Sequence, residues 1–98
     1  MSVPVHIRLM ARADIRSASE YLNRQQSNLG DRFENEVLDS LTRISDMPLA
    51  FGEVDPGIRA VGVNRFGYVI YYRTDGTEVE VLAILHEASD DRAWKDRV

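Results

Sequence analysis

The chain has 98 residues, a length that suits one domain with a single hydrophobic core. Its 44% hydrophobic and 29% charged residues are typical of a folded globular protein, and no apolar run approaches the ~20 residues of a membrane helix. The net charge of −4 argues against an extended nucleic-acid surface, and the absence of cysteine excludes disulfides and thiolate metal sites.

The first residues, Met1 to His6, contain neither a basic n-region nor an apolar h-region. We therefore expect no signal peptide and a cytoplasmic location. Apolar residues then alternate with polar ones at Val3, Val5, Ile7 and Leu9, which predicts a strand with one buried face. Pro4 lacks an amide proton, so this strand should begin there or lie at a sheet edge.

Two helices should follow. The first is predicted over about 11–26, with an apolar stripe formed by Ile15, Ala18, Tyr21 and Leu22. Ser27 or Asn28 is expected to cap the second helix, and Asp31 suits its first turn. Apolar residues recur along that helix at Leu29, Phe33, Val37, Leu41 and Ile44, and it should end before Pro48. The short break between the helices predicts a helical hairpin.

The rest of the chain is predicted to be rich in strands. Residues 49–57 read as a loop, and 58–63 as a strand. The runs 67–73 and 78–85 flank Asp75-Gly76, which favours a tight turn between two antiparallel strands. A short helix should begin at Asp90, with Ser89 as its cap. The expected fold is thus α+β over residues 1–98 as a single domain: an N-terminal strand, a two-helix hairpin, a three-stranded antiparallel meander and a short C-terminal helix.

This order of elements resembles the ParE/RelE superfamily of bacterial type II toxins. The resemblance runs almost from end to end, and it rests on several short segments: 13–15, Tyr21-Leu22, 30–33, Ile44, Met47-Pro48, 57–59, 68–73 and 81–86. Members of the family often have an arginine three residues after the histidine that corresponds to His86. Ser89 stands at that position in this chain, which puts the role of that arginine in doubt.

The resemblance implies two alternative activities. RelE-like members are ribosome-dependent mRNA endonucleases, which need an acid, a base and cationic groups around the scissile phosphate. If this chain were RelE-like, the residues available would be Arg59, Arg73 and His86, and the loop from Asp46 to Gly57 holds no basic residue. ParE-like members bind DNA gyrase and trap its cleaved complex, which requires a protein-binding surface and no catalytic residues. The ParE-like alternative fits better, and a non-toxic relative that only binds an antitoxin is a third possibility.

Each candidate residue also has a structural interpretation. For the gyrase target we expect contacts from Arg65, Trp94 and Arg97, although Trp94 could instead cover an open end of the core. His86 is a lone histidine at a strand end, a position at which a structural role is more common. Arg59 and Arg73 lie on or beside neighbouring strands and could share a face, or they could pair with Glu78, Glu80 or Asp75.

No cofactor or metal is expected, because Asp90 and Asp91 are adjacent residues without further ligands nearby and suit the start of a helix. The resemblance implies a small ParD-like antitoxin as partner, with an amphipathic segment lying along the helical hairpin and the sheet edge. The region from Ser27 to Gly57 is acidic, with seven Asp or Glu against two Arg, and would favour basic side chains on that segment.

Overall fold

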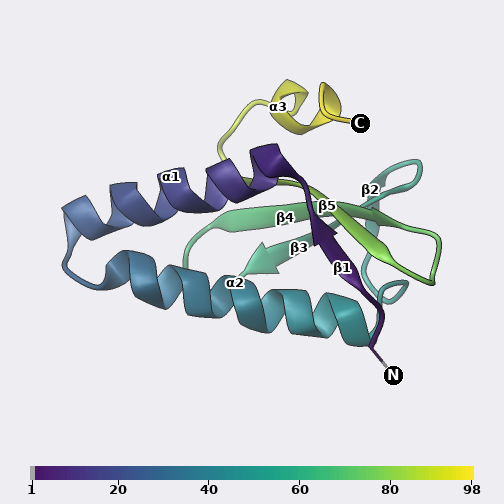
Figure 1. Ribbon diagram of the computed structural model, residues 1–98. Helices are drawn as coiled ribbons and strands as arrows, with labels where there is room; N and C mark the ends of the chain where they lie inside the picture. Colours follow the sequence, from purple (N-terminus) through teal and green to yellow (C-terminus); the bar gives the residue numbers. More distant parts are fainter. Residues whose placement is uncertain (1) are drawn as a thin grey trace.

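The computed structural model describes residues 2–98 and contains one five-stranded sheet with the strand order β1-β5-β4-β3-β2. Its strands are β1 (Val5–Ile7), β2 (Glu53–Asp55), β3 (Ile58–Val63), β4 (Tyr68–Thr74) and β5 (Val79–His86). The helices are α1 (Leu9–Gln25), α2 (Leu29–Asp46) and α3 (Arg92–Lys95). The predicted α+β arrangement is thus confirmed (Figure 1).

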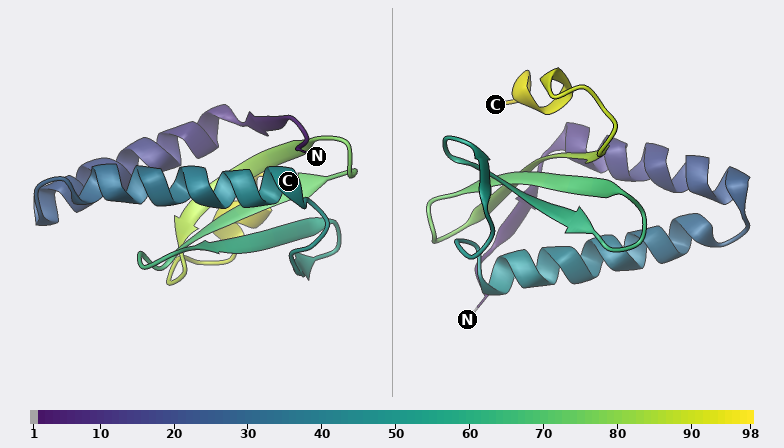
Figure 2. Two further views of the ribbon diagram at one scale, coloured as in Figure 1. Left: turned by 90° about the horizontal axis from the view of Figure 1, so that it is seen from below. Right: turned by 180° about the vertical axis from the view of Figure 1, so that it is seen from behind.

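Helices α1 and α2 form the expected hairpin and lie together against one face of the sheet (Figures 1 and 2). The apolar stripe of α2 supplies the centre of the core, where Phe33 and Ile44 are fully buried. The stripe of α1 is less completely covered, since Ala18 is buried whereas Tyr21 is half exposed. Tyr72 and Ile70 face the same core from β4.

The opposite face of the sheet carries a smaller core beneath α3. It consists of Ile58, Leu82, Ala83 and Trp94, with Tyr71 and Leu85 packed against them. A β-bulge in β5 makes this possible: Tyr71 lies opposite Ala83 and Tyr72 opposite Val81, so Leu82 is an extra residue. Tyr68 and Tyr72 pack against the core beneath the helices and Tyr71 packs against the smaller core, so Tyr71 faces the opposite side of the sheet.

The N-terminal strand is shorter than predicted, because α1 begins at Leu9 rather than at about residue 11. The Arg8 amide makes the last bond to β5, donating to Val81, and the Arg8 carbonyl already accepts the first helical bond from Arg12. Leu9 therefore belongs to the helix and is 83% exposed. Strand β1 pairs with β5 in parallel, whereas every other pairing in the sheet is antiparallel.

The predicted loop 49–57 contains an additional strand, so the antiparallel part of the sheet has four strands rather than three. Strand β2 pairs with β3 through Glu53–Arg59 and Asp55–Ile58 at the edge of the sheet. All three of its residues are exposed. Because no face of β2 is buried, the strand has no alternating apolar pattern to reveal it in the sequence.

The expected helix caps differ from those observed. Asn28 occupies the N-cap position of α2 in a left-handed conformation with φ 68°, but its side chain makes no capping bond. Instead Asn23, near the end of α1, accepts a hydrogen bond from the Gly30 amide at 2.7 Å. At α3 the cap is also not Ser89, because the Asp90 carboxylate accepts the Arg92 amide proton at 2.9 Å.

Candidate functional site

Arg59 holds the segment after α2 against the sheet. Its Nη1 donates to the carbonyls of Leu49 at 3.3 Å and Phe51 at 2.5 Å, and its Nη2 lies 3.6 Å from the Glu53 carboxylate. The side chain is only 20% exposed. These contacts tie Arg59 to the segment after α2 and give it a structural role.

Arg73 lies on the other face of the sheet, so the expectation that Arg59 and Arg73 share a face is wrong. Arg59 is directly opposite Tyr72, which points into the core beneath the helices, and Arg73 is the next residue after Tyr72. Residues that are adjacent along a strand point to opposite faces. Arg73 instead pairs with Glu80, as the structural interpretation predicted, at 2.6 Å from Nε to Oε1.

Glu80 joins two arginines from different parts of the chain. It accepts from Arg8 Nε at 2.8 Å as well as from Arg73 Nε. The hydrogen bond from Arg8 is the largest cause that lowers the pKa of the Glu80 carboxyl below its ordinary value of 4.5. Burial, the next largest cause, opposes it, and the hydrogen bond and charge of Arg73 lower the pKa further. Arg8, Glu80 and Arg73 thus form a charged network that joins the residue between β1 and α1 to β5 and β4.

His86 ends β5 in an exposed position at the far end of the hairpin from Arg73. Its Nδ1 accepts the Ala88 amide proton at 3.1 Å, and its ring meets Tyr68 edge-on at 5.2 Å between centroids. Burial raises the pKa of the Tyr68 hydroxyl. His86 lies opposite Tyr68, and Tyr68 precedes Arg73 by five residues on β4. Five residues of extended strand place His86 about 16 Å from Arg73 along the sheet. The structure therefore does not bring Arg59, Arg73 and His86 together.

Trp94 covers the smaller core. Its indole is 4% exposed and stacks on Tyr71 with centroids 5.0 Å apart and an interplanar angle of 14°. Trp94 therefore covers an open end of the core, which is the structural interpretation given for this residue above. Burial also raises the pKa of the Tyr71 hydroxyl.

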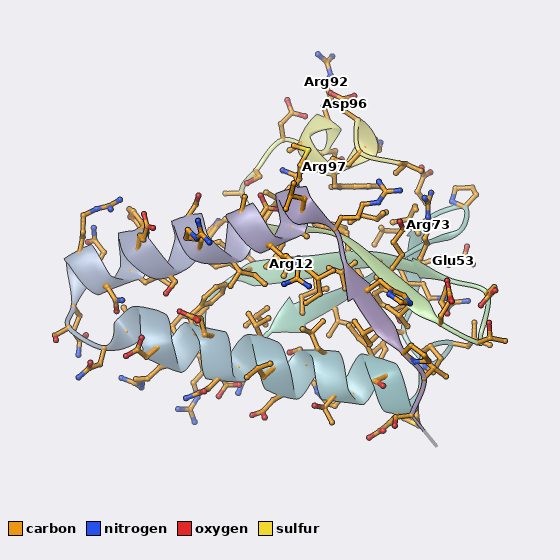
Figure 3. The ribbon with its side chains drawn as sticks, in the orientation of Figure 1. Arg12, Glu53, Arg73, Arg92, Asp96 and Arg97 are labelled. Atoms are coloured by element: carbon orange, nitrogen blue, oxygen red, sulfur yellow. The ribbon has the colours of Figure 1, made fainter. Side chains whose placement is uncertain are left out.

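Arg97 fastens the end of the chain to α1. Its guanidinium makes a two-pronged contact with Asp14, at 2.5 Å from Nη1 to Oδ2 and 3.1 Å from Nη2 to Oδ1. Asp14 also accepts the Ile84 amide proton at 3.0 Å, and Arg8 donates to the Arg97 carbonyl. Figure 3 shows Arg97 reaching from the tail toward the start of α1, whereas Arg92 points outward. The sequence analysis did not predict the pairing of Asp14 with Arg97. An aspartate between Ala11 and Ile15 on a helix face is a signal for a buried ion pair.

Arg65 is the one expected target-binding residue that is exposed. It occupies the turn between β3 and β4 with φ 73°, and within residues 2–98 it forms no ion pair. The three expected contact residues thus differ in environment, since Trp94 is buried and Arg97 is held by Asp14.

Two surface features were not predicted from the sequence. One is a hollow of about 500 Å³ between α1, β1 and α2, here called the interhelical hollow, which is lined by Ile7, Arg12, Ile15, Arg16, Ser19, Glu20 and Glu34. The other is an apolar groove of about 590 Å³ beside α3, where Leu9 and Met10 of α1 face Leu82 and Ala93. Neither could be found from periodicity, because both depend on where α1 begins relative to β1.

Two further searches concern the described part of the chain. Among residues 2–98, no three His, Asp or Glu side chains are grouped as a metal site would require. None of the helices in that range has the length and apolar character needed to cross a membrane.

Comparison with known proteins places this arrangement in context. The family model described as "ParE toxin of type II toxin-antitoxin system, parDE" matches residues 5–91. A structure of the chromosomal ParDE toxin–antitoxin system from P. aeruginosa is similar with a TM-score of 0.76 and 15% identity, over 87% of this chain and 96% of that one. A mutant of the E. coli toxin RelE in the free state is similar with a TM-score of 0.71 and 14% identity, over 99% of this chain and 95% of that one. No curated protein matches the sequence.

Proposed function

This chain belongs to the ParE toxin family of type II toxin–antitoxin systems, and we propose that it arrests growth by binding DNA gyrase rather than by cutting RNA. In this proposal the toxin acts in the cytoplasm through a protein surface and needs no cofactor. Its growth effect is neutralised by a ParD-like antitoxin encoded beside it.

The observation that carries the proposal is the separation of the residues that a ribonuclease would need. Cleavage of a phosphodiester requires a base, an acid and cationic groups within reach of one phosphate. Arg59 and Arg73 lie on opposite faces of the sheet, each bonded within the protein, and His86 is at the other end of β4 from Arg73. A surface that works by protein contact needs no such convergence.

The target surface is proposed to include Arg65 together with the tail from Ser89 to Val98. Arg65 is exposed on its turn and free to contact a partner directly. Trp94 and Arg97 would contribute by fixing the tail on the sheet and on α1, which sets the position of the exposed Arg92 and Lys95. Tryptophan and arginine are common at the centres of protein interfaces.

The alternative is a RelE-like endonuclease, and the likeness of the fold to E. coli RelE is the observation in its favour. In that alternative Arg59, Arg73 and His86 would carry the reaction. The third candidate is a non-toxic relative that only binds an antitoxin, for which the replacement of the family's arginine by Ser89 is the argument.

Pulse-labelling of DNA and protein synthesis after induction without antitoxin tests the proposal. We expect slowed growth with filamentation and a DNA-damage response, while bulk translation continues at first. Arg59→Ala and Arg73→Ala test the ribonuclease alternative: under the gyrase proposal they should have graded effects on toxicity rather than abolish it, since binding energy is spread over several contacts.

An immediate loss of protein synthesis with cut messenger RNA would contradict the gyrase proposal, as would complete loss of mRNA cleavage in either arginine variant with the fold intact. The absence of any growth effect would favour the non-toxic relative.

A further inference from the structure

Strand β2 covers only the first half of β3. It pairs with Ile58 and Arg59, and the Gly52 carbonyl then accepts the Ala60 amide proton at 3.2 Å. In the part of the chain that the structure describes, no segment pairs with β3 on this side beyond Ala60. The outer edge of β3 is therefore open over residues 61–63, a stretch here called the open β3 edge.

The open β3 edge directs one pair of backbone groups outward. Alternate residues of a strand direct their amide and carbonyl to the same side. Because the Ala60 amide bonds outward to Gly52, the backbone groups of Gly62 also point away from β4. Among the hydrogen bonds of residues 2–98, none from another segment reaches Gly62 on this side. Gly62 is exposed, and a Cβ built there would meet nothing within 4 Å, so the space around it is open.

A hollow of about 580 Å³, here called the α2–β3 hollow, lies beside this edge. Figures 1 and 2 show β3 ending beside α2. The residues that line the hollow are polar or glycine: Glu36, Asp39, Thr42 and Arg43 from α2, and Gly62 and Asn64 from β3 and the turn after it.

The charges of the α2–β3 hollow favour a basic ligand. Its two carboxylates, Glu36 and Asp39, form no ion pair within residues 2–98. The guanidinium of Arg43 donates instead to the Ser40 hydroxyl at 3.1 Å. Two carboxylates against one guanidinium leave the hollow with a net negative charge, so a lysine or arginine side chain is the complementary group.

The open β3 edge leads directly into the turn that carries Arg65. Strand β3 ends at Val63, and Arg65 follows two residues later in a left-handed conformation with φ 73°. The Arg65 side chain is exposed and is the residue already proposed to contact the target directly. The proposed target surface is therefore continuous from Arg65 to Gly62 and the α2–β3 hollow.

We propose that an extended, basic segment of the gyrase target adds as a strand to the open β3 edge. Its backbone exchanges hydrogen bonds with Gly62, and one lysine or arginine side chain enters the α2–β3 hollow to meet Glu36 and Asp39. Backbone bonds supply affinity in such strand addition, while the charges of the hollow supply specificity. A second copy of this chain is a poorer occupant, because it would bring the same acidic side chains to the contact. The inference rests on the proposed gyrase target and goes further by naming the segment that is recognised.

A proline substitution tests the strand addition. The probe is purified DNA gyrase, with both subunits and a duplex DNA fragment, titrated with the full-length chain. Gly62→Pro removes the outward amide, which β4 does not use, and edge strands accept proline at such positions. It should raise the Kd for gyrase at least about tenfold, because a backbone bond is lost and the ring obstructs the approaching strand. Gly62→Ala keeps the amide and is the comparison variant, with a Kd within about threefold of the wild type.

A charge reversal tests the hollow independently. Glu36→Lys combined with Asp39→Lys should raise the Kd for gyrase at least about tenfold, because the basic side chain of the target then meets like charges. Glu20→Lys combined with Glu78→Lys changes the net charge equally at exposed residues outside the hollow. This matched control should leave the Kd within about threefold.

Thermal melts establish that each variant is folded before its Kd is compared. If the wild-type chain binds gyrase and the Kd is unchanged by Gly62→Pro and by the reversal at Glu36 and Asp39, the inference is overturned and the proposed function stands. A wild-type dimer in solution that Gly62→Pro dissociates would assign the open β3 edge to a second copy and likewise overturn the inference. Failure of the wild-type chain to bind gyrase at all overturns the gyrase proposal, and the inference falls with it.

Discussion

Asp14 and Arg97 illustrate how single residues hold the tail of this molecule in place. Their side chains are 12% and 14% exposed. The aspartate also accepts the amide proton of Ile84, in the part of β5 that lies beyond its pairing with β1. A buried pair is worth most as an intact unit, because removal of one member leaves the other charge without compensation.

We therefore expect Asp14→Ala and Arg97→Ala each to lower the free energy of unfolding by about 2–4 kcal/mol. The double variant should lose less than the sum, with a coupling of at least about 1 kcal/mol in a double-mutant cycle from urea unfolding. Arg92→Ala, at an exposed arginine of α3, is the control and should change stability by less than about 0.5 kcal/mol. Additive losses in the double variant would contradict the pairing.

Glu80 makes stability dependent on pH in the acid range. Its pKa in the folded protein is lowered by Arg8 and Arg73 from the ordinary value of 4.5. A carboxyl with a lowered folded pKa contributes its full stabilisation above the unfolded value and loses it as the pH falls through the folded value. Because the side chain is 35% exposed, solvent screening limits this contribution to about 1 kcal/mol or less.

Glu80→Gln should accordingly be less stable than the wild type at pH 7, and the difference should shrink as the pH falls below about 4.5. Thermal melts at a series of pH values measure it. Glu87→Gln, an exposed carboxylate without an ion pair within residues 2–98, provides the control. A difference that stays constant between pH 7 and pH 3 would refute this account.

At the scale of elements, Gly30 sets the close approach of the two helices. A Cβ built at this position would lie 2.3 Å from the Ser19 carbonyl oxygen and 2.8 Å from Asn23 Cγ. Since the nearest atom belongs to the backbone of α1, the helices would have to separate. The Gly30 amide also needs Asn23 at its present distance as a cap.

Gly30→Ala should therefore destabilise the protein by about 2–3 kcal/mol, even though alanine is the better helix former. Gly62→Ala in β3 is the matched control, because a Cβ there meets nothing within 4 Å. Chemical denaturation of the two variants compares them directly. Equal stability of Gly30→Ala and Gly62→Ala would show that the helix crossing is looser than described.

The sequence predicted the elements that bury a regular apolar face. Phe33, Val37 and Ile44 recur at helical spacing and are buried, so α2 was placed correctly up to the residue before Met47-Pro48. Strand β2 was missed because all its residues are exposed, and its pairing depends on backbone contacts with β3 that leave no periodic signal.

The candidate site was less predictable, because its geometry depends on register. Strand assignments alone do not say that Arg59 faces the core beneath the helices while Arg73 faces outward, since this follows from the pairing of Arg59 with Tyr72. The bulge at Leu82 has the same character: one extra residue changes which side chains of β5 lie under Trp94. Ion-pair partners such as Asp14 and Arg97 lie far apart in the chain and become evident only in three dimensions.

For the molecule as a whole, the two faces of the sheet are covered very unequally. The helical hairpin covers one face with two long elements, whereas a four-residue helix and the residues around it cover the other. The smaller cover is held by a few identifiable contacts: the Trp94 stack, the Arg97–Asp14 pair and the bond from Arg8 to the Arg97 carbonyl. The position of the tail therefore depends on these three contacts.

The parallel pairing of β1 with β5 has a consequence for how the toxin is made. Val5 lies opposite Val79, so the first strand to leave the ribosome must wait for the last one to be synthesised. Contacts between such distant residues form late in folding, because a long loop has to be closed first. The helical hairpin can assemble early, but the edge formed by β1 does not exist until most of the message has been translated. The sheet is thus completed only after β5, the last strand, has been synthesised.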